Sequence, residues 1–179
     1  MTRIRPLTCA AVMAATLLTA GPVLAGPPLL CHPFDIGAAR SLPMGSGGWR
    51  ATDPAYNISH LVDDTLALLT PQTPILVRME TIRRATIYAS ANTAVAEALL
   101  NALQQRAAIP TPDVPLALFD FGYLVETYRE GTFMFSAPVA AIDRIDGYQI
   151  VLKARAIARN DEMTPAAKLI AESQAHGAK

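Results

Sequence analysis

From Thr52 to the C-terminus, apolar side chains recur at steps of three and four residues, the spacing that places them on one face of an α-helix. The alternation of apolar and polar residues that is typical of a half-buried β-strand does not occur outside Phe133 and Phe135. The pattern therefore predicts an all-α fold. The expected helices cover residues 53–69, 74–89, 93–107, 116–128, 148–159 and 166–175, with a short helical turn over 139–145.

Two of these helices differ from the others because their apolar side chains point in nearly every direction. In the helix over 74–89, Val77 and Ile87 lie away from the main apolar stripe, and the helix over 116–128 is also apolar on all sides. Such helices are expected to be buried by neighbours on more than one side. The others are amphipathic and should flank them as antiparallel helical hairpins in an irregular bundle. A short α-solenoid is the alternative, although the helix pairs are unevenly spaced along the chain.

Prolines mark the expected helix starts. Each follows a small polar residue that can cap the free N–H groups of a first helical turn, where the N–H that proline lacks would have no partner anyway. The four pairs are Asp53-Pro54, Thr73-Pro74, Thr111-Pro112 and Thr164-Pro165.

Residues 1–25 are typical of a secretory signal peptide. Two arginines precede an uncharged apolar run, Gly21-Pro22 ends that run, and Val23-Leu24-Ala25 fits the small-x-small cleavage rule. Cleavage would leave Gly26 as the first residue and place the protein in the periplasm or outside the cell. A single membrane anchor is the alternative, but the run is shorter than the roughly 20 residues that a span needs. No later stretch is long enough, so we expect no stable membrane span after cleavage.

The rest of the chain divides into an irregular segment and one helical domain. Four prolines and the sequence Gly45-Ser46-Gly47-Gly48 predict irregular structure over residues 26–51, and the helical domain is expected over 52–179. The whole chain has 15 basic and 15 acidic residues, and the leader contains two arginines and no acid. The exported part is therefore slightly acidic, which argues against nucleic acid as a partner.

A cluster of charged residues falls on the helix over 74–89, in the stretch VRMETIRRA. Glu80 precedes Arg83 by three residues and Arg84 by four, so its carboxylate can pair with both arginines on one helix surface.

Arg78 and Arg83 flank the apolar stripe of this buried helix. A buried charge is costly unless it is paired, so we expect partners such as Asp120 and Glu126 on the other all-round apolar helix. The alternative is an anion or carboxylate site in a groove, for which Arg78, Arg83 and Glu126 are the candidate binding residues.

Cys31 and His32 stand side by side in the irregular segment, where Cys31 is the only cysteine left after cleavage. A thiolate and an imidazole can bind copper or zinc, but a metal site needs three or four ligands and no spacing supplies the others. The alternatives are a reactive or intermolecularly paired thiol, and a small apolar residue packed in the core. Trp49, the only tryptophan, is a candidate anchor or surface contact for the same segment.

Three stretches of the chain resemble exported bacterial α-helical proteins of no assigned function, which are faintly similar to tetratricopeptide-type helix pairs. These stretches are GPPLLCHPFDIGAARSLP, GGWRATDPAYNISHLVDDTLALLTPQTPILVRMETIRRATIYA and DGYQIVLKARAIARND. The resemblance implies export and a helical architecture, without a known chemistry. The tetratricopeptide signature itself does not recur at its 34-residue period.

The sequence contains no Gly-x-Ser-x-Gly or His-Glu-x-x-His motif and indicates no cofactor. It favours a non-enzymatic protein-interaction or scaffold module of the cell envelope, whose helical hairpins present a groove to a peptide or to another envelope protein. The main alternative is a metal-binding or thiol-redox protein that uses Cys31 and His32. An enzyme with an unfamiliar site near Arg78 and Glu126 is a further alternative.

Overall fold

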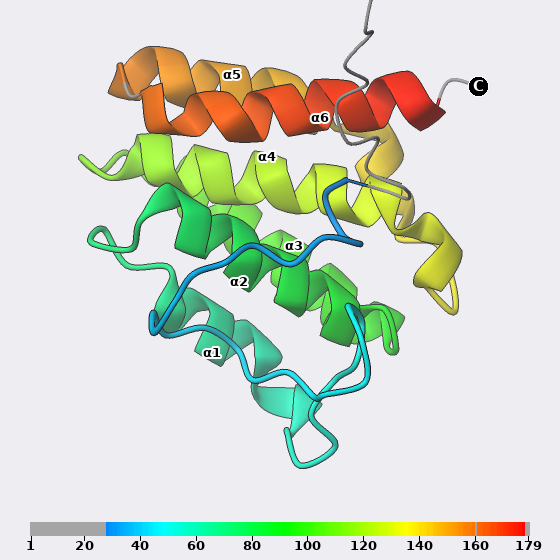
Figure 1. Ribbon diagram of the computed structural model, residues 1–179. Coiled ribbons are helices and arrows are strands. Elements are labelled where there is room, and N and C mark those ends of the chain that lie inside the picture. Colours follow the sequence, from blue (N-terminus) through cyan, green and yellow to red (C-terminus); the bar gives the residue numbers. More distant parts are fainter. Residues whose placement is uncertain (1–27, 160, 178–179) are drawn as a thin grey trace, which may run out of the picture.

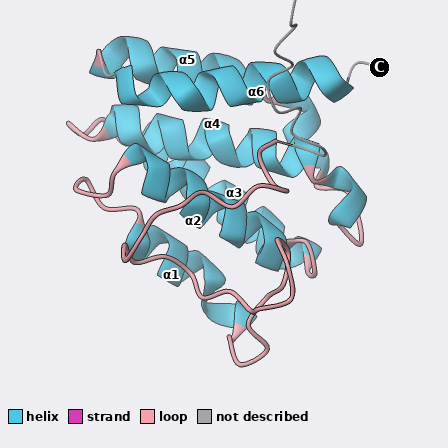
Figure 2. Cartoon of the chain, viewed as in Figure 1, coloured by secondary structure: helices cyan, strands magenta, loops and turns pink. Residues whose placement is uncertain are grey.

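The computed structural model describes residues 28–159 and 161–177, and within these ranges it is helical with no strand (Figure 2). The predicted all-α fold is confirmed, while the predicted leader and its cleavage point lie outside the described residues. None of the described helices is long and apolar enough to cross a bilayer. The α-helices are α1 (Leu61–Leu68), α2 (Ile75–Ala89), α3 (Thr93–Ala108), α4 (Val114–Glu130), α5 (Gly147–Ala158) and α6 (Thr164–Gly177). Short 3-10 helices are η1 (Ile58–His60), η2 (Thr132–Met134), η3 (Ala140–Arg144) and η4 (Asp161–Met163).

Helix α4 lies at the centre of the bundle. Every residue from Phe119 to Tyr128 is buried, because α4 packs against α2, α3, α5 and α6 (Figure 1). Helices α5 and α6 form an antiparallel hairpin on one side of α4. With α4 packed on four other helices at its centre, the fold is an irregular bundle of helices.

Helix α2 is the second buried helix, as its all-round apolar pattern predicted. All of its residues except Leu76 and Arg84 are buried. It packs against α1, α3 and α4. The irregular N-terminal segment, which contains no helix over residues 28–51, runs across its remaining face (Figure 1).

The first helix begins later than predicted. Asp53-Pro54 starts a turn instead of a helix: the side chain of Asp53 accepts the N–H of Ala55 at 2.9 Å. Aspartate and proline favour such turns as much as helix starts, and only the residues that follow decide between them. The helical stretch starts after Asn57, whose side chain caps η1 by accepting the N–H of Ser59 at 3.1 Å.

Helices α4 and α5 approach closely at two glycines. A Cβ at Gly122 would lie 2.7 Å from the carbonyl oxygen of Gly147, and a Cβ at Gly147 would lie 2.5 Å from the carbonyl oxygen of Gly122. Side chains at these positions would force the two backbones apart, so glycine sets the distance between the helices.

Candidate functional site

Three charged side chains of α2 are buried: Arg78, Glu80 and Arg83 belong to residues that are at most 1% exposed. A buried charge without a partner is strongly destabilising. The groups that surround these side chains therefore define what α2 can bind.

Glu80 pairs with both arginines that the sequence spacing predicted. Its carboxylate oxygens lie 2.7 and 2.9 Å from Nε and Nη2 of Arg83, and 2.6 Å from Nε of Arg84. Burial by itself would raise the pKa of Glu80, but the hydrogen bonds from Arg83 and Arg84 hold that pKa below its ordinary value. Glu80 is therefore a carboxylate that is already neutralised by the same helix.

The N-terminal segment crosses this face of α2 twice. Residues 28–34, which we call the N-terminal arm, begin with a turn over 28–32 and then run along α2 (Figure 1). Residues 35–40 reverse the chain, and residues 41–44, which we call the return, run back along α2. The turn contains Gly37 in the left-handed region, at φ 55°, and the N–H of Gly37 donates to Asp35 Oδ1 at 3.0 Å. Such a φ favours glycine, so the sequence supports the reversal at this point.

The N-terminal arm is held through its main chain. Glu130 Oε1 accepts the N–H groups of Leu29 at 2.8 Å and of Leu30 at 3.0 Å. Arg83 Nη1 donates to the carbonyl oxygen of Leu30 at 3.0 Å, and the N–H of Phe34 donates to Glu80 Oε2 at 3.0 Å. We call Glu80, Arg83 and Glu130 the arm seat. The side chains of Leu29 and Leu30 are fully buried beneath these bonds.

The return is also held through carbonyl groups. Arg84 Nη1 donates to the carbonyl oxygen of Leu42 at 2.6 Å, and the hydroxyl of Tyr88 donates to that of Pro43 at 2.8 Å. The polar face of α2 thus binds the main chain of the N-terminal segment.

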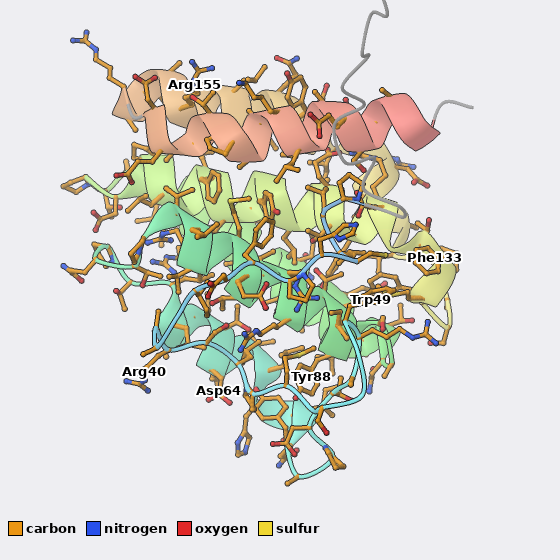
Figure 3. The ribbon with its side chains drawn as sticks, viewed as in Figure 1. Arg40, Trp49, Asp64, Tyr88, Phe133 and Arg155 are labelled. Carbon is orange, nitrogen blue, oxygen red and sulfur yellow. The ribbon has the colours of Figure 1, made fainter. Side chains whose placement is uncertain are left out.

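Trp49 joins the same site through its backbone. Its carbonyl oxygen accepts a hydrogen bond from Arg83 Nη1 at 2.9 Å, while its side chain is half-buried (Figure 3). The candidate binding residues Arg83 and Trp49 are therefore brought together, with Arg83 joining the start of the arm to the residues that follow the return.

Arg78 occupies a separate buried site with one of its predicted partners. Arg78 Nη1 lies 2.6 Å from Asp120 Oδ2, and Nε donates to the carbonyl oxygen of Thr73 at 3.0 Å. Nη2 donates to the carbonyl oxygen of Thr70. Complete burial raises the pKa of Asp120 to about 6, and the attraction of Arg78 opposes this only in part.

Glu126 has a different role from the one expected for it. It pairs with Arg129 of its own helix instead of with Arg78 or Arg83. Its carboxylate also accepts the N–H of Tyr148 at 3.1 Å and the side-chain amide of Gln174 at 3.2 Å. The reason is the close approach of α4 and α5, which puts the unpaired N–H groups at the start of α5 within reach of Glu126.

Cys31 and His32 lie half-buried in the N-terminal arm. Burial raises the pKa of the Cys31 thiol, the charge of Glu130 raises it further, and Arg83 opposes both. A thiol that stays protonated is a weak nucleophile and a weak metal ligand. Within the described ranges, no three or more side chains of His, Cys, Asp and Glu come together as a metal site would require.

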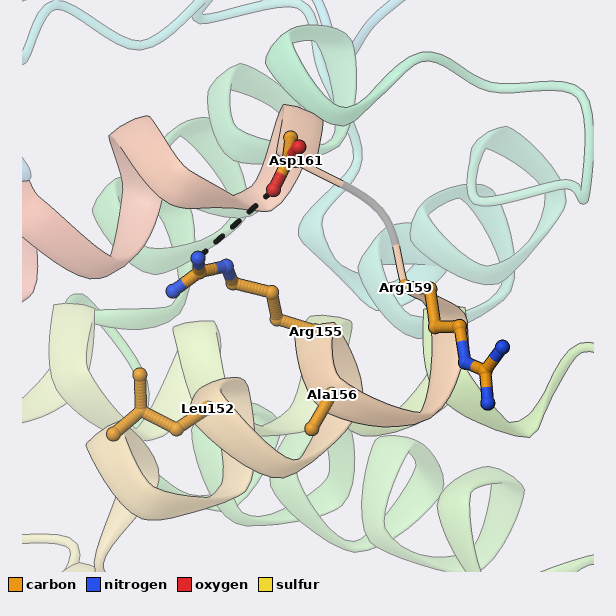
Figure 4. A pocket seen from close by; sticks show the side chains of 5 residues that line it. All are labelled: Leu152, Arg155, Ala156, Arg159 and Asp161. Atoms are coloured by element: carbon orange, nitrogen blue, oxygen red, sulfur yellow. Dashed lines mark ion pairs between the residues drawn. The ribbon is translucent and has the colours of Figure 1, made fainter.

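A surface pocket of about 370 Å³ lies at the corner between α5 and α6 (Figure 4). Arg155 reaches toward Asp161, with 3.9 Å between Nη2 and Oδ1, while Arg159 points away from it. Asp161 is 99% exposed, so this ion pair contributes little. The pocket contains none of the candidate residues and offers no buried polar group to hold a ligand. Its lining residues are Leu152, Arg155, Ala156, Arg159 and Asp161.

Two residues of the N-terminal binding surface were missed by the sequence analysis: Glu130 and Tyr88. Each binds main-chain groups that lie far away along the chain, and a main-chain group has no signature in the sequence. The burial of α2 was the available signal, because it implied that every charge on that helix had a partner.

Comparison of the chain with protein-family models, with curated proteins and with solved structures finds no match.

Proposed function

We propose that the protein is an exported, non-enzymatic interaction or scaffold module of the cell envelope. The observation that supports this proposal is the arm seat, where Glu80, Arg83 and Glu130 hold the N-terminal arm by its N–H and C=O groups. Bonds to main chain give affinity that is nearly independent of sequence, and the pockets that bury side chains such as Leu29 and Leu30 provide selectivity.

Export is the part of the proposal that rests on residues 1–25. The purified product should begin at Gly26 and should be released with the envelope contents by osmotic shock. Intact-mass measurement and N-terminal sequencing test this directly. A product that still carries its leader and stays with the cytoplasm would contradict export.

The contact surface for a partner is expected beside the arm. Phe133 is 61% exposed, more than any other large apolar residue of the described chain. Phe133 belongs to η2, and the residue before η2, Gly131, packs against the arm. A Cβ added to Gly131 would lie only 2.8 Å from Leu30 Cδ1, which shows how close the two segments are.

A photoreactive amino acid placed at Phe133 in living cells tests this surface. The matched control is the same group at Glu97, an exposed position on α3. We expect one envelope protein to be crosslinked from Phe133 and not from Glu97, and the reciprocal experiment from that protein to return this chain. Equal labelling from both positions, or none from Phe133, would count against an interaction role for this end of the molecule.

A further inference from the structure

We propose that the N-terminal arm exchanges between two copies of the chain, so that the arm of each copy occupies the arm seat of the other. This inference rests on the proposed interaction function and names a partner for the arm seat: a second copy of the same chain. Three features of the described chain support this inference. The first is the linker, residues 35–40, that joins the arm to the return. The second is the place at which this linker leaves and rejoins α2, and the third is the chemistry of the arm seat.

Residues 35–40 have the properties of a hinge. All are exposed except Ile36, which is half-buried. Their hydrogen bonds close their own turn: Gly37 N–H donates to Asp35 Oδ1 at 3.0 Å, and Ala39 N–H donates to the carbonyl oxygen of Ile36 at 3.1 Å. Opening this turn exposes little new apolar surface and disturbs no buried bond.

The linker starts and ends at the same place on α2. The arm ends where Phe34 binds Glu80, and the return begins where the hydroxyl of Ser41 meets that of Thr81, the next residue of α2, at 3.0 Å. The six linker residues therefore double back in the closed form. Extended, they span about 20 Å, which is enough to carry the arm to an adjacent molecule while Arg84 still holds the return.

The seat also restricts its occupant. An empty seat would leave the half-buried carboxylate of Glu130 without two N–H donors and Arg83 without one acceptor. Any segment that takes the place of the arm must supply two N–H donors for Glu130 and a carbonyl acceptor for Arg83. It must also carry two adjacent apolar side chains that fit the space of Leu29 and Leu30. The arm of a second copy meets every one of these conditions, and a reciprocal exchange closes with two-fold symmetry.

Isotope mixing tests the exchange on the full exported chain. Preparations grown with ¹⁵N and with ¹⁴N are mixed at high concentration and analysed by native mass spectrometry. We expect mixed dimers that form slowly, since each arm must first leave its own seat. Monomers alone at every concentration, with the helical circular dichroism intact, would overturn the inference.

A variant with a shortened linker tests the hinge. Deleting Ala38 and Ala39 removes the hydrogen bond from Ala39 to the carbonyl oxygen of Ile36 and shortens the turn, so the folded-back form should be strained. The dimer should then form at concentrations at least tenfold lower than for the unaltered chain. The matched control has serine at both positions, which preserves the linker length and should leave the dimer equilibrium unchanged. A folded, monomeric deletion variant would overturn the exchange.

A peptide competitor shows whether the dimer forms through the arm. The peptide of residues 28–34 in excess should return the mixed dimer to monomers, and the same peptide with Leu29→Asp and Leu30→Asp should not. A dimer that resists the first peptide forms through another surface and contradicts arm exchange. If the chain is monomeric but Phe133 still yields its envelope adduct, only the exchange is wrong and the proposed function stands.

Discussion

Arg83 donates hydrogen bonds to four oxygen atoms: the two carboxylate oxygens of Glu80 and the carbonyl oxygens of Leu30 and Trp49. No donor of comparable reach replaces it at this position of α2, because Arg84 is committed to Glu80 and Leu42. At the scale of single residues, the buried charges of α2 therefore determine whether the N-terminal segment stays bound.

The substitution Arg83→Ala should lower the free energy of unfolding by about 3 kcal/mol or more. It leaves buried Glu80 with one cation, and it leaves the carbonyl groups of Leu30 and Trp49 without this donor. Arg84→Ala is the control, since the Arg84 side chain is 21% exposed and its loss should cost about 1 kcal/mol. Urea denaturation measures both values. If the two variants lose the same free energy of unfolding, the deeper burial of Arg83 does not make its hydrogen bonds more stabilising.

The raised pKa of Asp120 predicts that its contribution to the stability of the fold decreases as the pH rises. Its pKa is about 6 in the folded state against 3.8 for the free group, so the folded state binds the proton more tightly. Its contribution to stability, up to about 3 kcal/mol, is complete below pH 4 and is lost as the pH rises through about 6.

Urea midpoints measured between pH 4 and pH 7 for the native chain and for Asp120→Asn test this contribution. Glu130, whose pKa is also raised by burial, and Glu80, whose pKa is lowered, affect both proteins alike. The difference between the two curves therefore reports Asp120. Parallel curves would mean that Asp120 stays ionised throughout this range.

Cys31 should react slowly with a thiol reagent at neutral pH in the folded protein and rapidly in urea, because burial and Glu130 keep its proton in place. The rate at which the reagent's chromophore is released measures this contrast, and Cys31→Ser provides the blank. A fast reaction in the folded state would favour the thiol-redox alternative over the interaction role.

At the scale of elements, the helices form where their apolar periodicity is strong. The expected helix over 74–89 is α2 within one residue, and that over 93–107 is α3 within one residue. The expected helix over 53–69 began too early, because an aspartate–proline pair supports a turn as readily as a helix start. The pairing of Arg78 with Asp120 was also predictable, because two buried helices must neutralise each other's charges.

The arm seat was beyond prediction for a physical reason. Its contacts are main-chain groups of the arm bound by Arg83 and Glu130, and a main-chain group is the same in every sequence. Only the packing of distant segments brings these groups together. The fold class therefore followed from local pattern, whereas the candidate site depended on the assembled bundle.

Gly122 determines how closely α5 packs on α4. Gly122→Ala should destabilise the protein by about 1–3 kcal/mol, because the new Cβ meets the carbonyl oxygen of Gly147 at 2.7 Å. This effect opposes the gain of up to about 1 kcal/mol that alanine normally gives in a helix. Thermal unfolding measures it against Gly47→Ala, whose Cβ would meet only the side chain of Ala51, at 3.3 Å. A stabilised Gly122→Ala protein would mean that α5 moves away without cost.

At the scale of the whole molecule, the N-terminal segment and the bundle share one set of interactions. The carbonyl group of Trp49 is bound by Arg83, and Leu29 and Leu42 are part of the same apolar core as α2 and α4. Removing the segment would leave Glu130 without two N–H donors and Arg83 without two carbonyl acceptors. The chain is therefore expected to unfold as a unit.

Trp49 provides a test of that unity, since it is the single tryptophan and lies outside the helices. Its fluorescence and the helical circular dichroism signal should change with the same urea midpoint. The Arg83→Ala protein should show the fluorescence change first, because its substitution frees the segment around Trp49. A separate early fluorescence transition in the unaltered chain would mean that the segment is only loosely attached.

The bonds from Leu29 and Leu30 to Glu130 connect positions 101 and 100 residues apart. As the chain emerges from the N-terminus, Leu29 and Leu30 therefore have no carboxylate to bind until Glu130, the last residue of α4, has appeared. Closing so long a loop is entropically costly, so this step should come after the local helices have formed. Nascent chains that stop short of Glu130 should leave their first segment open to proteases, and quality control can recognise such products by that free end.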